Sequence, residues 1–140
     1  MILSAGVVIV RKEAGIWKYL FLRAYQNWDF PKGIVEAGED PLETAKREAG
    51  EESGITVLNF RWGSVYKETA PYYSGGKKVA RYYIAETPES RVTLSINPEL
   101  GRPEHHEYLW LPYDEIKKRS PKRLEPIIAW AHDLLGQGKK

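Results

Sequence analysis

The most constraining feature of this sequence is residues 33–55, GIVEAGEDPLETAKREAGEESGI, which place a glycine-bounded loop before a short acidic segment. Asp40, Pro41 and Glu43 supply an N-cap, a favourable first helical position and a capping-box partner, in the order that a helix start needs. The segment therefore predicts a helix over 41–53.

The predicted helix carries an apolar stripe beside a face of carboxylates. At 100° per residue, the apolar side chains Leu42, Ala45 and Ala49 fall on one narrow stripe. The adjoining arc holds three acids, which are Glu48, Glu51 and Glu52.

Those acids make the segment a poor helix on local grounds. Like charges three or four residues apart destabilise a helix by about 0.2–0.5 kcal/mol per pair, and Gly50 costs about 1 kcal/mol relative to alanine. A divalent cation would remove the repulsion, and Mg²⁺ typically takes one or two carboxylates, waters and substrate phosphates. The alternative is a solvated acidic face balanced by Arg47, which lies four residues after Glu43 and four before Glu51.

The order of the residues adds a further constraint. The stretch fits G-x5-E-x7-R-E-U-x-E-E-x-G-U without a gap, where U is apolar and Ala49 is a small first U. The matching positions are Gly33, Glu39, Arg47, Glu48, Glu51, Glu52, Gly54 and Ile55. In this pattern the chain resembles Nudix hydrolases. The resemblance implies an α+β fold, an α/β/α sandwich with a mixed sheet between helices, and Mg²⁺-dependent cleavage of a diphosphate linked to another moiety, with Mn²⁺ as a possible substitute.

Features outside the stretch resemble one branch of that family, the diadenosine tetraphosphate hydrolases of the animal and archaeal type. They are Trp28 with Phe30-Pro31-Lys32-Gly33, the strand-like segment 78–86, and Glu104-His105 followed by Tyr108, Trp110 and Leu111. This branch implies asymmetric cleavage of diadenosine tetraphosphate to ATP and AMP. One departure is Ile34, where such hydrolases often carry a histidine.

The family resemblance also implies roles for the residues of the stretch. Glu48, Glu51 and Glu52 would hold the metal, together with a main-chain carbonyl at Lys32 or Gly33. Arg47 would orient these glutamates, and Glu39 would brace the loop. A surface ion pair is the simpler interpretation of Arg47.

Four residues outside the helix are further candidates. Lys32 and Lys78 would meet the polyphosphate, and Tyr82 would stack on a base. Glu104 would bind metal or accept a proton from the attacking water. Ordinary strand positions for Lys78 and Tyr82, and a solvated loop acid for Glu104, are the structural alternatives.

The composition limits the remaining possibilities. A chain of 140 residues with 42% hydrophobic content has room for a single domain, 1–140, with a proper core. The sequence contains no cysteine, which excludes disulfides and cysteine-based zinc sites. A net charge of +2 indicates no stable nucleic-acid partner, so we expect a small nucleotide or dinucleoside polyphosphate as partner.

The first ten residues, MILSAGVVIV, are apolar but too short to span a bilayer, so they predict a buried strand and no membrane partner. The cytoplasm is the default location.

The rest of the chain alternates between strand and helix patterns. Strands are expected over 4–11 and 17–23 as a hairpin or neighbouring pair, and over 105–111. Segments 55–68 and 79–85 suggest a long antiparallel hairpin, with a bulge or bend at Gly63. Loops are expected over 71–78 and 88–103, and helices over 113–119 and around 124–135.

Two other functions stay open at this point. A pyrophosphohydrolase acting on the 5′-triphosphate end of RNA would use the same metal site. A non-catalytic nucleotide-binding module belongs to a different class, although no acid of the motif is missing here.

Overall fold

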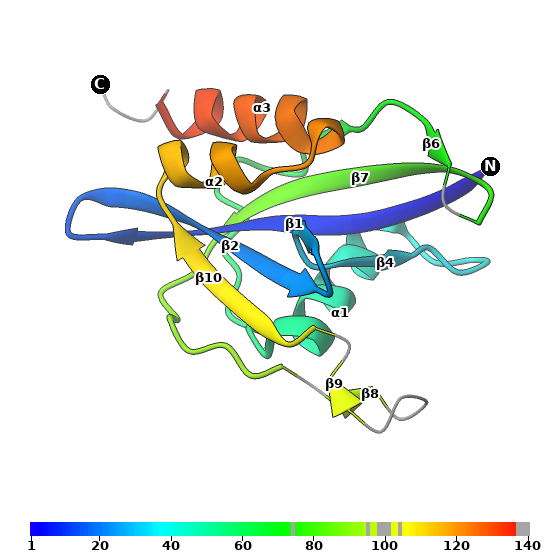
Figure 1. Ribbon diagram of the computed structural model, residues 1–140, viewed down its shortest axis with the longest axis horizontal. Coiled ribbons are helices and arrows are strands. Elements are labelled where there is room, and N and C mark those ends of the chain that lie inside the picture. Colours follow the sequence, from blue (N-terminus) through cyan, green and yellow to red (C-terminus); the bar gives the residue numbers. More distant parts are fainter. Residues whose placement is uncertain (74, 95, 98–101, 104, 137–140) are drawn as a thin grey trace.

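A mixed β-sheet between helices forms the centre of the molecule (Figure 1). The computed structural model describes residues 1–73, 75–94, 96–97, 102–103 and 105–136. Strand β1 (Ile2–Glu13) pairs in parallel with β7 (Lys77–Glu86) and antiparallel with β2 (Ile16–Ala24). The main strand order is β10-β2-β1-β7-β5, where β10 is Glu107–Leu111 and β5 is Tyr66–Glu68. The expected α/β/α sandwich is confirmed.

Short strands and helical segments complete the fold. The short strands are β3 (Asn27–Asp29) on β2, β4 (Lys32–Ile34) on β1, β6 (Tyr72–Tyr73) on β7, and the separate pair β8 (Ile96–Asn97) and β9 (Arg102–Pro103). The helices are α1 (Pro41–Ser53), α2 (Tyr113–Arg119) and α3 (Glu125–Gly136), with a 3₁₀ turn over Lys122–Leu124.

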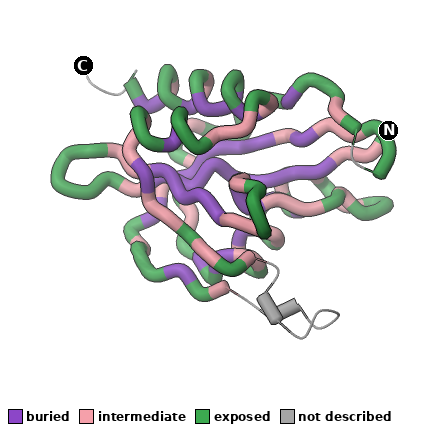
Figure 2. The backbone as a smooth tube through the Cα atoms, viewed as in Figure 1, coloured by how far each residue is buried: buried purple, intermediate pink, exposed green. Residues whose placement is uncertain are grey.

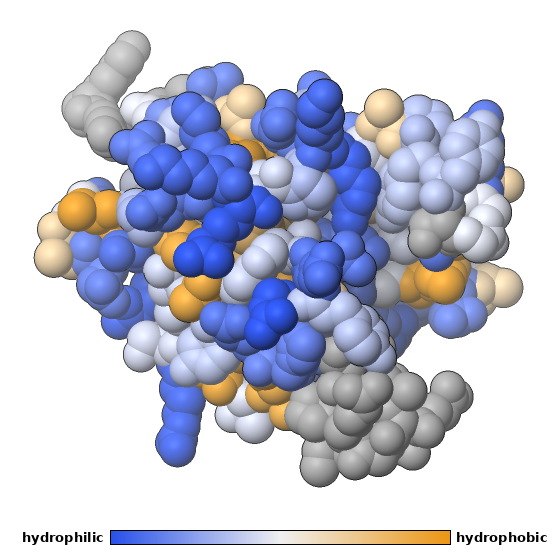
Figure 3. Space-filling model, in the orientation of Figure 1, coloured by the Kyte–Doolittle hydropathy of each residue, from blue (hydrophilic) through white to orange (hydrophobic). Residues whose placement is uncertain are grey.

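The central strands are buried on both faces, as the purple tube of Figure 2 shows. Val8 and Val10 of β1 pack on the side of α2 and α3, whereas Val7 and Ile9 pack on the side of α1. A strand covered on both faces reads as a continuous apolar run, which explains the β-branched sequence of β1. On the molecular face drawn in Figure 3, hydrophilic side chains predominate and hydrophobic ones are scattered.

Local signals predicted several elements well. Helices α1 and α2 have the expected bounds, and β1 and β2 form the expected hairpin. Asp40 caps α1 by accepting hydrogen bonds from the backbone N–H groups of Leu42 and Glu43, at 3.1 and 3.2 Å. The carboxylate of Glu43 contacts Lys46 at 3.2 Å, so its contact along the helix takes the place of the expected capping box.

The strand expected over 55–68 is wrong for most of its length. Only Tyr66–Glu68 forms a strand, preceded by a single bridge between Asn59 and Glu86. A turn interrupts the segment, since the N–H of Gly63 donates to the carbonyl of Phe60 and Gly63 has a φ of 84°. The bend expected at Gly63 is therefore present, and it limits the hairpin with β7 to three residue pairs.

Two of the expected loops contain short strands. Within 71–78, Tyr72 and Tyr73 pair with the beginning of β7. Within 88–103, residues 96–97 pair with 102–103. Two-residue strands lie below the length at which an alternating pattern can be read from sequence. Within the part of the chain that the structure describes, no helix is long and apolar enough to cross a membrane.

The N-cap of α1 gives a stability prediction. Asp40→Ala should lower the free energy of unfolding by about 1 kcal/mol, because two backbone donors lose their acceptor. Asp40→Asn keeps an acceptor of similar capping strength, and its stability should stay within about 0.5 kcal/mol of the wild-type protein. Urea unfolding followed by circular dichroism measures both. Equal losses in the two variants would contradict the capping role.

Candidate active site

Helix α1 lies directly against the β1–β4 layer of the sheet (Figure 1). Ala45 and Ala49 are fully buried in the core on this side, and Leu42 packs at its edge. The predicted apolar stripe is therefore the face that meets the sheet. The adjoining carboxylate arc consequently turns toward the backbone of β4.

Two glycines allow three backbone segments to come together there. A Cβ atom at Gly33 would clash with the carboxylate of Glu48, so the acid of α1 lies directly against the main chain of β4. A Cβ atom at Gly6 would clash with the carbonyl of Pro31 and the side chain of Lys32. Sequence analysis predicted the role of Gly33 but missed Gly6, whose partner is 25 residues away and only becomes visible when β1 pairs with β4.

The backbone of β4 also contacts the last glutamate of the motif. The N–H of Lys32 donates to Oε1 of Glu52 at 3.1 Å. This bond fixes the orientation of Glu52 relative to the loop that precedes β4. Glu48 and Glu52 thus both lie against the backbone of β4.

Arg47 connects the remaining acids. Its Nη1 donates to Glu48 at 2.8 Å and to Glu51 at 3.0 Å, and its Nε and Nη2 contact Glu39 at 3.0 and 3.2 Å. Glu39 in turn accepts from the N–H of Glu36 at 3.0 Å, which closes the loop before α1. This geometry matches the positions expected for Arg47 as an orienting residue and for Glu39 as a loop brace.

The contacts shift the pKa values of both partners. Hydrogen bonds from the Arg47 side chain and from the Glu36 backbone lower the pKa of Glu39 from 4.5 to about 2. Hydrogen bonds to Glu39 and Glu51 raise the pKa of Arg47 above its usual value. The pair therefore stays charged throughout the physiological range.

The donor set at α1 suits a hard cation. Glu48, Glu51 and Glu52 offer only oxygen atoms. Gly33 has no side chain, so its backbone lies directly against the Glu48 carboxylate. In the structure, Arg47 holds Glu48 and Glu51 while the N–H of Lys32 holds Glu52. Among the described residues, no three His, Asp or Glu side chains converge as a ready metal cluster.

Asp29, immediately before the Phe30-Pro31-Lys32 loop, is a site residue that sequence analysis missed. Its Oδ1 accepts from the Tyr82 hydroxyl at 2.8 Å, and its Oδ2 accepts from Arg123 at 2.8 Å. The ammonium of Lys32 lies 3.6 Å from Oδ2. Asp29 thus holds the loop that carries Lys32 against the core, and no local pattern marks it because its partners are 53 and 94 residues away.

Tyr82 is not placed for the expected stacking on a base. Its side chain is completely buried, its ring meets Phe30 edge-on at 5.7 Å, and burial raises the pKa of its hydroxyl. The ring is enclosed because α3 covers this face of the sheet. A structural role through Asp29 replaces the stacking role.

Of the two remaining candidates, the structure describes only Lys78, and it is not brought to the glutamates. Lys78 is half-buried at the start of β7, where it pairs with Ile2 and Tyr72. It alternates with Ala80 and Tyr82, which face the core under α3 rather than α1. Glu104 lies outside the described residues.

Comparisons with known proteins identify the family. A model of the NUDIX domain matches residues 2–131, and the chain belongs to the Nudix family. The chain is thus a pyrophosphohydrolase of that family.

Two relatives with different activities are similar to this chain. An asymmetrical bis(5′-nucleosyl)-tetraphosphatase from Mus musculus is 32% identical over 94% of this chain and 94% of its own length. An RNA pyrophosphohydrolase from Bartonella bacilliformis is 31% identical, over 40% of this chain and 38% of its own length.

Solved structures share the fold. A binary complex of the C. elegans Ap4A hydrolase aligns with a TM-score of 0.78 and 28% identity, covering 97% of this chain and 99% of the other. The NUDIX domain of Shewanella oneidensis NrtR, solved with ADP ribose, aligns with a TM-score of 0.70 at 14% identity, covering 96% of this chain and 88% of the other.

The Arg47 contacts predict a measurable titration. In the wild-type protein the Glu39 carboxylate should titrate near pH 2, and in Arg47→Ala its pKa should rise toward 4.5. Because the folded-state pKa is lowered, the associated stability is present above pH 4.5 and is lost as the pH falls toward 2. NMR titration of side-chain carboxylates measures both values.

Lys46→Ala is the matched control for this titration. It removes the neighbouring cation, which contacts Glu43 instead, so the pKa of Glu39 should not change. A wild-type pKa of Glu39 near 4.5, or an equal response to both substitutions, would contradict the assigned contacts.

Proposed function

We propose that this protein hydrolyses dinucleoside polyphosphates in a Mg²⁺-dependent reaction and cleaves diadenosine tetraphosphate asymmetrically into ATP and AMP. The main support for this substrate is the near full-length similarity to a protein named an asymmetrical bis(5′-nucleosyl)-tetraphosphatase. The fold similarity to an Ap4A hydrolase over 97% of the chain supports the same substrate.

In this proposal the acids of α1 hold the metal. Glu48, Glu51 and Glu52 are the carboxylate ligands, and the main chain at Lys32 or Gly33 contributes a carbonyl. A bound Mg²⁺ supplies charge that polarises phosphoryl oxygens and lowers the pKa of bound water. Arg47 keeps the glutamates in position, since its planar group contacts Glu39, Glu48 and Glu51 at once.

The polyphosphate chain needs cations outside the metal site. Lys32 is the first candidate, because Asp29 holds it on the loop that lies against α1. Lys78 is a second cation for a longer phosphate chain, and Glu104 is the candidate acceptor for the proton of the attacking water. Catalysis then consists mainly of positioning and charge compensation.

A different aromatic residue takes the place of Tyr82 in base recognition. A cavity of about 230 Å³ beside β3 is lined by Trp28, Arg119 and Arg123. The Arg119 guanidinium lies 5.5 Å from the centre of the Trp28 ring. An indole and a guanidinium both stack on bases, so we assign one nucleobase of the substrate to this cavity.

The metal assignment predicts a strong dependence on Glu52. Glu52→Gln keeps the shape but removes the charge, so kcat with Mg²⁺ should fall by orders of magnitude while the fold is kept. Glu43→Gln makes the same change on the same helix at an exposed acid outside the motif, and kcat should be unchanged. Steady-state kinetics with circular dichroism compares the two. Near-normal turnover in a folded Glu52→Gln protein would overturn the metal assignment.

Product analysis tests the substrate class. Diadenosine tetraphosphate should yield equal amounts of ATP and AMP by chromatography, whereas symmetric cleavage would give two ADP molecules. The second candidate is removal of pyrophosphate from 5′-triphosphorylated RNA, favoured by the similarity to an RNA pyrophosphohydrolase. A higher kcat/KM on triphosphorylated RNA than on the dinucleotide would support that alternative. Consumption of ADP-ribose with cleavage of neither the dinucleotide nor the triphosphorylated RNA would overturn both.

A further inference from the structure

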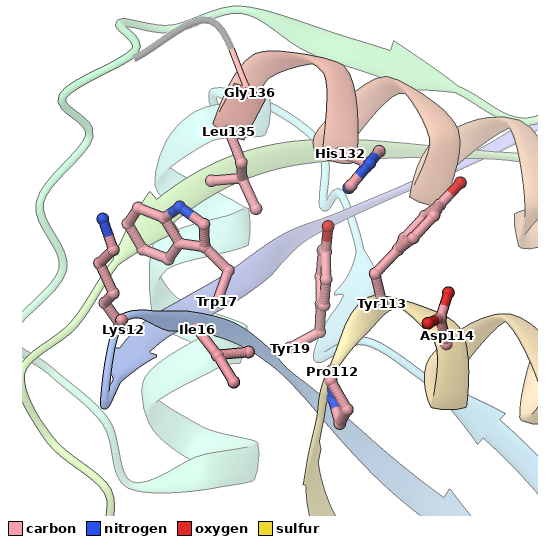
Figure 4. Close-up of a pocket in the computed structure, with 11 residues that line it drawn as sticks. Lys12, Ile16, Trp17, Tyr19, Pro112, Tyr113, Asp114, His132, Leu135 and Gly136 are labelled. Carbon is pink, nitrogen blue, oxygen red and sulfur yellow. The ribbon is translucent and has the colours of Figure 1, made fainter. Parts of the chain in front are cut away.

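A second cavity lies at the far end of the β1–β2 hairpin (Figure 4). It has a volume of about 580 Å³, within the usual range for small-molecule sites. Three segments line it, which are the hairpin tip, the start of α2 and the end of α3. This places the cavity on the α2/α3 face of the sheet, opposite the face that packs against α1.

The walls of the cavity are flat and aromatic. Tyr113 and His132 stack with ring centres 3.7 Å apart and an angle of 7° between their planes, which makes one double-layered wall. Trp17 lies across from this pair, with Tyr19 between the two sides (Figure 4). Ile16 adds an apolar surface below. Flat π-faces on two sides favour a planar ring system.

The floor of the cavity holds a hydroxyl group without a partner. Tyr19 is fully buried, and its hydroxyl makes no hydrogen bond to any described residue. Its ring rises toward His132 and Leu135 between the walls (Figure 4). Burial raises the pKa of this hydroxyl, so it keeps its proton and acts as a donor. A ligand that brings an acceptor to this position would satisfy a group that the chain leaves unpaired.

The charge at the edge of the cavity is asymmetric. Lys12 projects beside Trp17, with its ammonium 5.3 Å from the centre of the indole ring. Asp114 lies on the other side, beyond Tyr113 (Figure 4). An anionic group on a ligand is therefore favoured at the Lys12 side and disfavoured at the Asp114 side.

We infer that this cavity is a second ligand site, separate from the catalytic glutamates, that binds a nitrogen heterocycle carrying an anionic group, with the chemistry of a nucleoside monophosphate. The ring packs against the aromatic side chains that line the cavity. A ring nitrogen accepts from the Tyr19 hydroxyl, and the phosphate meets Lys12. The inference does not depend on which diphosphate the enzyme cleaves.

Residue-resolved NMR tests the site directly. The probes are AMP, adenosine and ribose 5-phosphate, each titrated into the ¹⁵N-labelled full chain with EDTA present to exclude metal-dependent binding. AMP should shift the amides of residues 15–19, 113–114 and 132–136 in a saturable way. Adenosine should shift the same amides with weaker affinity, and ribose 5-phosphate should leave them unchanged.

Three substitutions separate the contacts. Tyr19→Phe should weaken AMP about fivefold through loss of one hydrogen bond. Trp17→Ala should weaken both AMP and adenosine about tenfold or more through loss of stacking. Lys12→Ala should abolish the advantage of AMP over adenosine.

Tyr82→Phe is the matched control, because it removes the other fully buried tyrosine hydroxyl, which is already paired with Asp29. It should leave the affinity for AMP at the hairpin end unchanged. Shifts confined to residues 25–34 and 47–52 would assign AMP to the catalytic cleft and overturn the second site. Affinities that stay within about twofold in all three cavity variants would overturn it as well.

Discussion

The close approach of the β4 backbone to α1 is the constraint on which the site depends. Gly33 leaves room for the Glu48 carboxylate, and the N–H of Lys32 binds Glu52. On the β1 side, position 6 must also be a glycine, because the carbonyl of Pro31 occupies the space that a side chain would need. A side chain at Gly33 would displace the Glu48 carboxylate, and a side chain at Gly6 would push away residues 31 and 32. The pairing of β1 with β4 and the position of the acids therefore depend on each other.

Arg47 shows how the chain holds three acids on one helix face. The sequence left two interpretations open, a metal site or an acidic face balanced by arginine, and in the structure Arg47 contacts Glu48 and Glu51. Exposed ion pairs contribute little stability, typically below about 1 kcal/mol, so Arg47 matters mainly for geometry. Its contacts with Glu39, Glu48 and Glu51 join the loop to the helix.

The sequence predicted what depends on neighbouring residues and missed what depends on distant ones. Asp40 and Gly54 mark the ends of α1 locally, and both act as expected. The segment 55–68 has strand-like composition, but the turn at Gly63 removes most of the strand. Asp29 was missed and Tyr82 was given an exposed role for the same reason, since the bond between them spans 53 positions and its burial follows from the packing of α3.

Tyr19 and Tyr82 form an instructive pair because they share residue type, complete burial and the same core. The hydroxyl of Tyr82 reaches Asp29, so its desolvation is offset within the chain. The hydroxyl of Tyr19 has no such partner among the described residues, although a phenylalanine would fill the same space without an unpaired polar atom. An unpaired buried hydroxyl costs about 1–3 kcal/mol, and at Tyr19 that cost falls beside a cavity. A ligand position therefore differs from an ordinary core position in where the unpaired hydroxyl lies, not in how large its free-energy cost is.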